Sequence, residues 1–174
     1  MRLETSRETF RGDPLAAGGR RRLFLSWCDF SRRIASLDEH YGFEEMVYVP
    51  SPVLRKWQKP FGYLRQFAQS ARILATRRPD EVWLHCPPTF LPHLALLMRP
   101  FAGRYRIVAD YHSGATSAKW SWVPGAIWAV NRCDVILLHN QEAVPQAEAL
   151  GVRMDKTVLL EDPPATRMAA GEIG

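Results

Sequence analysis

The sequence is poor in cysteine and contains no long hydrophobic run. Its 174 residues include 3 cysteines, too few for a dense disulfide framework, so we expect a reducing compartment. Paired metal-ligand spacings are absent, and we therefore predict no metal and no cofactor. The longest apolar stretches, Phe90–Met98 and Trp122–Val130, fall short of the roughly 18 residues that cross a bilayer. Residues 1–22 are acidic in places and lack the apolar segment of a signal peptide, which predicts a cytoplasmic protein.

Glycine-rich phosphate-binding motifs are missing as well. No G-x-G-x-x-G follows the first apolar run, and no Walker A motif occurs in the chain. These absences argue against an NAD-dependent dehydrogenase and against a P-loop NTPase.

Acidic residues are absent between Met46 and Pro79, where positive charge is concentrated. The segment holds Arg55, Lys56, Lys59, Arg65, Arg72, Arg77 and Arg78. Because the whole chain has a net charge of +5, this segment alone exceeds the positive surplus, and such a patch indicates an anionic partner. Interleaved aromatic residues favour an anionic membrane surface; RNA and a solvated face without function are the alternatives. We assign the membrane contact to Arg55, Lys56, Trp57, Lys59, Arg65 and Arg72.

Six short apolar runs predict β-strands. They are Leu23–Trp27, Met46–Val49, Val82–Cys86, Arg106–Asp110, Val135–Leu138 and Thr157–Leu160. Most are continuously apolar, which indicates burial on both faces and hence a parallel sheet. Helical stretches alternate with them, so we predict a doubly wound, Rossmann-like α/β fold.

Apolar residues at helical spacing and capping residues predict the helices between these strands. They run over Phe61–Thr76, from Thr89 to about Met98, from Pro124 to Arg132, and from Asn140 to Gly151. In the first of them, Phe61 and Leu64 belong to the face expected to pack on the sheet, whereas Arg65 and Arg72 belong to the opposite face.

Polar residues follow the predicted strands, at the edge where open parallel sheets bind ligands. Asp110 and His112 lie two residues apart at one strand end, so their side chains can point to the same side. A carboxylate beside an imidazole fixes its tautomer and raises its basicity, which predicts a general base. The equally weighted alternative is a capping Asp110 and a surface His112. His85 lies within an apolar strand and is interpreted as a hydrogen-bonded core histidine.

Five short segments occur together in an order that is known from one family. They are Ser31-Arg32-Arg33, His85-Cys86-Pro87-Pro88, Asp110-Tyr111-His112-Ser113, His139-Asn140 and Asp162-Pro163-Pro164. On these segments the chain resembles the amino-terminal, acceptor-side domain of GT-B glycosyltransferases of the glycosyltransferase 4-like group. One departure is the first strand's exit, which has no glycine where many relatives have a Gly-rich loop.

The resemblance implies one half of a GT-B fold. It implies a Rossmann-like glycosyltransferase domain over 21–164 and a truncated linker over 165–174 toward a missing donor-binding domain. Residues 1–20 are polar, carry charges of both signs and have few apolar side chains, so their composition predicts a flexible tail. The nucleotide-sugar donor would be bound mainly by that second domain, as part of the same protein or as a partner chain. The isolated chain is therefore expected to be inactive.

The resemblance also implies sugar transfer from a nucleotide-sugar to a lipid-linked or glycan acceptor at the cytoplasmic face of the membrane. Asp110 and His112 would be catalytic. The acceptor cleft would contain Ser31, Arg32, Ser113, His139 and Asn140. The alternative function is a non-catalytic module that docks on a membrane or recruits a partner. An RNA-binding domain is the third hypothesis, and it is less favoured than the other two. We therefore expect no nucleic-acid partner.

Overall fold

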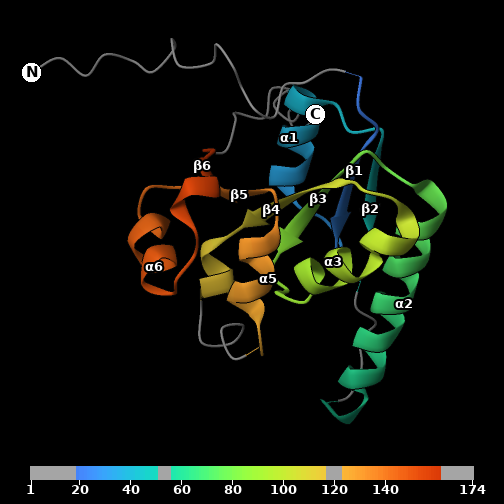
Figure 1. Cartoon of the computed structure of the whole chain (residues 1–174). Coiled ribbons are helices and arrows are strands. Elements are labelled where there is room, and N and C mark those ends of the chain that lie inside the picture. Colours follow the sequence, from blue (N-terminus) through green and yellow to red (C-terminus); the bar gives the residue numbers. More distant parts are fainter. Residues whose placement is uncertain (1–18, 51–55, 117–122, 162–174) are drawn as a thin grey trace, which may run out of the picture.

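The structure is a computed structural model that describes residues 19–50, 56–116 and 123–161. Within these residues, six parallel strands form one sheet in the order β2-β1-β3-β4-β5-β6 (Figure 1). The strands are β1 (Arg22–Ser26), β2 (Glu45–Tyr48), β3 (Glu81–Cys86), β4 (Arg106–Tyr111), β5 (Val135–Leu138) and β6 (Thr157–Leu159). Every apolar run that predicts a strand forms one, and the parallel pairing confirms the Rossmann-like α/β fold.

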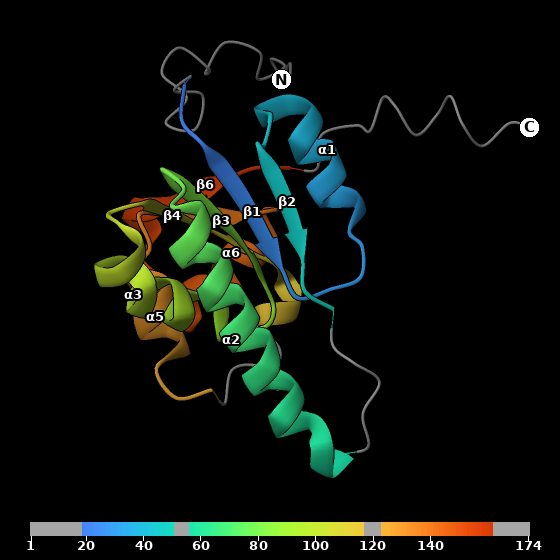
Figure 2. The ribbon, with the colours of Figure 1, turned by 90° about the vertical axis from the view of Figure 1, so that its right-hand side faces the viewer.

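Helices cover both faces of the sheet. They are α1 (Arg32–Tyr41), α2 (Lys59–Arg77), α3 (Leu91–Ala102), α5 (Ala126–Arg132) and α6 (Ala143–Ala149). Figure 2 shows α1 on one side of the sheet and α2 and α3 on the other. Alternate side chains of each strand serve the two layers: Leu25 and Leu84 belong to the core beneath α2 and α3, and Phe24 and Trp83 to the core beneath α1.

Helix α1 is not among the helices that the sequence predicts. Its buried stripe contains Ile34, Leu37 and Tyr41, which recur at helical spacing. It ends at Gly42, whose φ of 62° is left-handed and whose N–H donates to the carbonyl of Asp38. Charged residues of both signs, Arg32 and Arg33 before the stripe and Asp38 and Glu39 within it, interrupt the apolar pattern in the sequence.

Two helix starts differ from the prediction. Thr89 is buried and does not cap α3, because Phe90 occupies the cap position without a side-chain hydrogen bond. The predicted start at Pro124 is also wrong, since α5 begins after Gly125, whose φ of 69° reverses the chain. Asn140 does prepare α6 as predicted: its Oδ1 accepts the N–H of Ala143 at 2.8 Å.

Helix α2 is rotated relative to the predicted packing. Phe61 and Leu64, which we expected against the sheet, are 68% and 66% exposed, and Gln66 and Ser70 are buried instead. Polar contacts explain the rotation. Gln66 Nε2 donates to the carbonyl of Val49 at 2.7 Å, and the indole of Trp27 donates to Ser70 Oγ at 2.9 Å.

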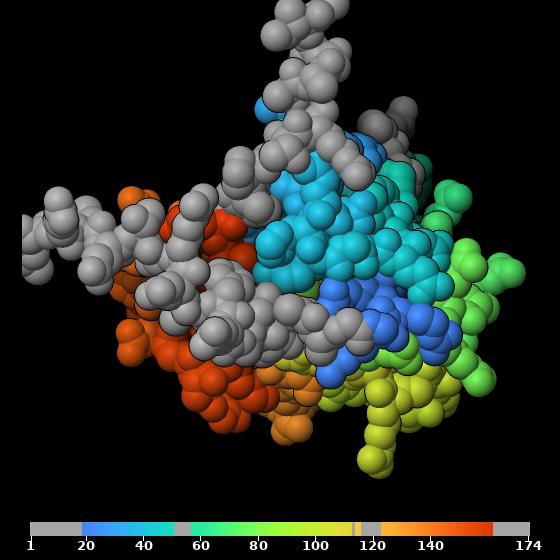
Figure 3. Space-filling model, turned by 90° about the horizontal axis from the view of Figure 1, so that it is seen from above, coloured from blue at the N-terminus to red at the C-terminus, as the bar shows by residue number. Residues whose placement is uncertain are grey.

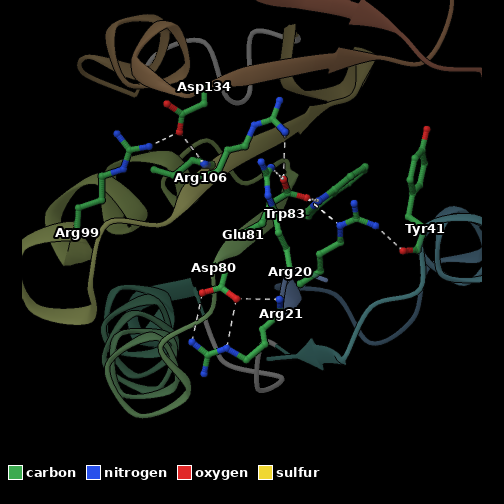
Figure 4. A network of polar contacts seen from close by, with 11 residues as sticks. Arg20, Arg21, Tyr41, Asp80, Glu81, Trp83, Arg99, Arg106 and Asp134 are labelled. Atoms are coloured by element: carbon green, nitrogen blue, oxygen red, sulfur yellow. Dashed lines mark hydrogen bonds and ion pairs between the residues drawn. The ribbon is translucent and has the colours of Figure 1, made fainter. Parts of the chain in front are cut away.

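A buried carboxylate joins the strands at the amino edge of the sheet (Figure 4). Glu81 is fully buried, and its oxygens lie 3.2 Å from nitrogens of Arg20, Arg22 and Arg106. The indole of Trp83 donates to the same carboxylate at 2.8 Å. Arg20, the last residue of the predicted tail, is thus attached to β3.

Candidate functional site

Polar side chains from three neighbouring strands and from α1 meet at the carboxyl edge of the sheet. His85 in β3 lies directly across from Asp110 in β4 in the strand register. His112 follows β4, His139 follows β5, and Arg33 reaches the same place from the first turn of α1. These five residues form what we call the histidine edge.

Asp110 lies at the base of the histidine edge and is fully buried. Arg33 Nε donates to both carboxylate oxygens, at 3.0 Å to Oδ1 and 3.1 Å to Oδ2. Arg33 Nη2 lies 3.0 Å from Oδ1 and also donates to the carbonyl of Leu160 at 3.1 Å. The guanidinium therefore connects α1, β4 and the end of β6. Figure 3 shows α1, in light blue to cyan, at the surface beside the orange to red residues near the end of the described chain.

Two imidazoles approach the same oxygen of Asp110. His112 Nε2 lies 3.2 Å and His85 Nδ1 3.6 Å from Oδ2. Burial by itself would raise the pKa of Asp110, but the hydrogen bond from His112, the nearby imidazole of His85 and the charge of Arg33 outweigh it and hold that pKa well below its usual range. Asp110 is therefore a carboxylate at any ordinary pH.

The imidazoles of the histidine edge lie in a row. The ring centroid of His112 is 4.9 Å from that of His85 and 4.8 Å from that of His139, on which it stacks. Asn140 Nδ2 lies 3.3 Å from His139 Nε2. The side chains of His85 and His112 are 15% and 23% exposed, so solutes reach the imidazoles but not the carboxylate beneath them.

The structure brings Asp110, His112, His139 and Asn140 together, as predicted for one edge of the sheet. Ser31 is half-buried at the start of α1 and Arg32 is exposed, whereas the neighbouring Arg33 is the arginine that enters the site. Ser113 begins a short 3-10 turn (Ser113–Thr116), and its side chain lies outside the described part of the structure.

Sequence reasoning missed Arg33 and His85 as members of this site. Arg33 directly precedes Ile34, the first apolar residue of the buried stripe of α1. An arginine beside such a stripe is the sequence feature that indicates a buried, paired side chain. His85 was interpreted as a core residue, although it stands next to last in its strand, where the side chain reaches the sheet edge.

His85, Asp110 and His112 are also the described residues that could hold a metal ion. One ligand atom from each lies within 4.8 Å of the others. The arrangement can thus act in proton transfer through an imidazole, or in cation binding through two imidazole nitrogens and a carboxylate oxygen.

The amino-terminal part of the basic segment lies at the same edge of the sheet, whereas Arg77, at the other end of α2, pairs with Glu45 at the start of β2. The amino-terminal end of α2 projects beyond the strands (Figure 2), and Lys59, Arg65 and Arg72 are exposed along the helix. Trp57, in the short 3-10 turn before α2 (Lys56–Gln58), is exposed too. Arg55 and the side chain of Lys56 lie outside what the structure describes. No helix within the described ranges is long and apolar enough to cross a membrane.

Comparison with known proteins finds similarity in structure alone. No protein-family model matches the sequence, and no curated protein does. The structure of HepE of Anabaena in complex with UDP-glucose matches with a TM-score of 0.60 and 13% sequence identity. The two chains share a fold. The match covers 84% of this chain and 44% of HepE, so the present chain spans less than half of that protein. A second HepE structure, with UDP and glucose, matches with a TM-score of 0.53 at the same identity.

Proposed function

We propose that this chain is the acceptor-side domain of a GT-B glycosyltransferase, which transfers a sugar from a nucleotide-sugar to a lipid-linked or glycan acceptor. The histidine edge supports this function most directly, because it lies where parallel α/β sheets bind their ligands. The fold shared with part of HepE, whose structure contains UDP-glucose, agrees with the proposal.

His112 is the proposed catalytic residue. With its Nε2–H directed at Asp110, its Nδ1 is the nitrogen left to accept a proton from the acceptor hydroxyl as the glycosidic bond forms. Asp110 is buried and acts through His112, whose tautomer and orientation it fixes. Ser31, Arg32, Ser113, His139 and Asn140 are the proposed contacts for the acceptor around the two.

The donor nucleotide-sugar is proposed to bind mainly to a second domain. The match to HepE supports this division, because it leaves more than half of that protein without a counterpart in this chain. The present chain then supplies the acceptor-binding site and the base, and it transfers sugar only together with a donor-binding domain.

A transfer assay tests this function. The chain is combined with the α/β domain encoded after it or beside it, and transfer from a panel of radiolabelled nucleotide-sugars to a membrane lipid extract is measured. We expect transfer by the pair and by neither half alone, and we expect His112→Gln to lower kcat by about 100-fold or more, as loss of a general base does. His40→Gln, an exposed histidine of α1 outside the histidine edge, is the matched control.

Full activity of the pair that carries His112→Gln would contradict the proposed role of His112 as the base. It would not contradict the proposal that the chain belongs to a glycosyltransferase. Absence of transfer with every nucleotide-sugar would instead favour a second candidate function, a non-catalytic module that docks on the inner face of the membrane and recruits a partner. The observation that favours this candidate is the exposure of Trp57, Phe61 and Leu64 next to the cations of α2.

A further inference from the structure

The atoms that face one another in the histidine edge have the spacing of metal ligands. A tetrahedral metal ion with bonds of about 2.0 to 2.1 Å holds its ligand atoms roughly 3.3 Å apart. Asp110 Oδ2 lies 3.2 Å from His112 Nε2 and 3.6 Å from His85 Nδ1. The two nitrogens are at most 4.8 Å apart, so a small rotation of the imidazoles closes the triangle.

His85 Nδ1 is buried and makes no hydrogen bond. At 3.6 Å from Asp110 Oδ2 it is beyond hydrogen-bonding distance. Buried polar atoms in native proteins nearly always have a partner, and this nitrogen is directed at the same oxygen that His112 contacts. A cation placed between the three atoms would supply the missing interaction.

Arg33 holds both oxygens of Asp110, including the one that the imidazoles face. Its Nη2 contacts Oδ1, and its Nε is shared between Oδ1 and Oδ2. Ligating carboxylates are commonly held by such a second partner. Because the guanidinium already balances the carboxylate charge, the imidazoles must provide most of the affinity, which favours Zn²⁺, Co²⁺ or Ni²⁺ over Mg²⁺ and Ca²⁺.

We propose that His85, Asp110 and His112 form a binding site for a divalent transition-metal ion, with Zn²⁺ as the best fit. Three protein ligands leave a fourth position open, and the exposed edges of both imidazoles provide access. The sequence alone predicts no metal, because the ligands come from two strands and lack a local spacing motif. A metal on Nε2 of His112 leaves the proton on Nδ1, so metal binding and proton acceptance by His112 exclude each other.

Metal titration of the tag-free full chain tests the site without any transfer assay. We expect one Co²⁺ per chain by calorimetry, with the intense visible bands of a tetrahedral site and no thiolate charge-transfer band. His85→Ala and His112→Ala should each weaken binding by about 100-fold or more, the upper range seen even for second-shell changes. His40→Ala should bind Co²⁺ as the unchanged chain does. Far-UV circular dichroism confirms that each variant is folded.

Three results would overturn the proposal. They are the absence of Co²⁺ and Zn²⁺ binding, binding that survives both His85→Ala and His112→Ala, and equal binding of Mg²⁺. Absence of metal binding would leave His112 free to act as the proposed base, and failure of the transfer assay would leave the metal site untouched.

Discussion

At the scale of single residues, Asp110 remains charged inside the protein because its neighbours replace the water that it loses. A buried carboxylate without partners costs several kcal/mol, and it usually takes up a proton instead. Here Arg33 contacts both oxygens and His112 contacts one of them. The charge of Asp110, and with it the orientation of His112, thus depends on an arginine that belongs to a different element.

Replacing Arg33 by Met should destabilise the protein strongly. The variant leaves the carboxylate of Asp110 buried without its cation, and breaking a buried pair in this way costs about 3 to 5 kcal/mol of unfolding free energy. Urea unfolding followed by circular dichroism measures the loss. Arg32→Met is the matched control, because Arg32 is the exposed neighbour on the same helix and should change stability by no more than about 0.5 kcal/mol. Equal losses in the two variants would contradict the role given to Arg33.

At the scale of elements, α2 exposes an apolar and basic end that the core does not use. Its buried residues Gln66, Ser70 and Leu74 attach it to the sheet, while Phe61 and Leu64 lie on the surface. Aromatic side chains beside cations suit the interface of an anionic bilayer. The rotation of the helix therefore adds apolar contacts to a surface for which the sequence predicts mainly charges.

Reversing two charges of α2 should weaken vesicle binding. Each cation near an anionic surface contributes about 1 kcal/mol, so Arg65→Glu with Arg72→Glu should weaken binding by at least about 30-fold. Co-sedimentation with phosphatidylglycerol vesicles measures the effect. Arg104→Glu with Arg153→Glu makes the same change of charge at exposed sites outside α2 and should bind as the unchanged chain does. Identical binding by the two double variants would exclude α2 as the contact.

The strands are predictable from the sequence because each is a continuous apolar run between polar turns, as in Val135–Leu138. Asp110 and His112 are predictable for the same reason, since they follow such a run. The face of α2 is not predictable in this way. Gln66 and Ser70 look like surface residues until Val49 and Trp27 are known to supply their hydrogen-bond partners.

Arg33 and His85 could not be assigned to the site from sequence either. Which of the two adjacent arginines enters the core depends on the rotational phase of α1. Membership of His85 depends on the strand order, because it meets Asp110 only where β3 and β4 are neighbours. Both facts belong to tertiary structure.

At the scale of the whole molecule, the candidate functional site and the buried ion pairs of Glu81 lie at opposite ends of the strands. The cluster that we call the histidine edge lies at the carboxyl ends of the strands. At their amino ends, Glu81 forms ion pairs with Arg20, Arg22 and Arg106. Glu81 lies in β3, at the middle of the sheet, and contacts residues of β1 and β4 on either side. Strand order thus places a fully buried charge where it can connect three chain segments.

Glu81→Gln should therefore destabilise the entire fold. The change leaves the buried guanidinium of Arg22 without a counterion, and we expect a loss of about 3 kcal/mol in the free energy of unfolding. Thermal or urea unfolding measures it. The preceding residue gives the control: Asp80 is 47% exposed and pairs with Arg21 at the surface, so Asp80→Asn should cost about 1 kcal/mol or less. A small effect for Glu81→Gln would show that the amino edge is held by other contacts.

The hydrogen bond from Arg33 to the carbonyl of Leu160 couples the position of Asp110 to the backbone that follows β6. The guanidinium that fixes Asp110 is attached to the backbone just after β6, near the point where the described chain ends. A pull on the segment beyond Glu161 would move Arg33, and through Arg33 it would shift the carboxylate on which His112 depends. Because the N–H of Leu160 also donates to the carbonyl of Leu138, the same backbone position is attached both to β5 and, through Arg33, to the carboxylate beneath the imidazoles.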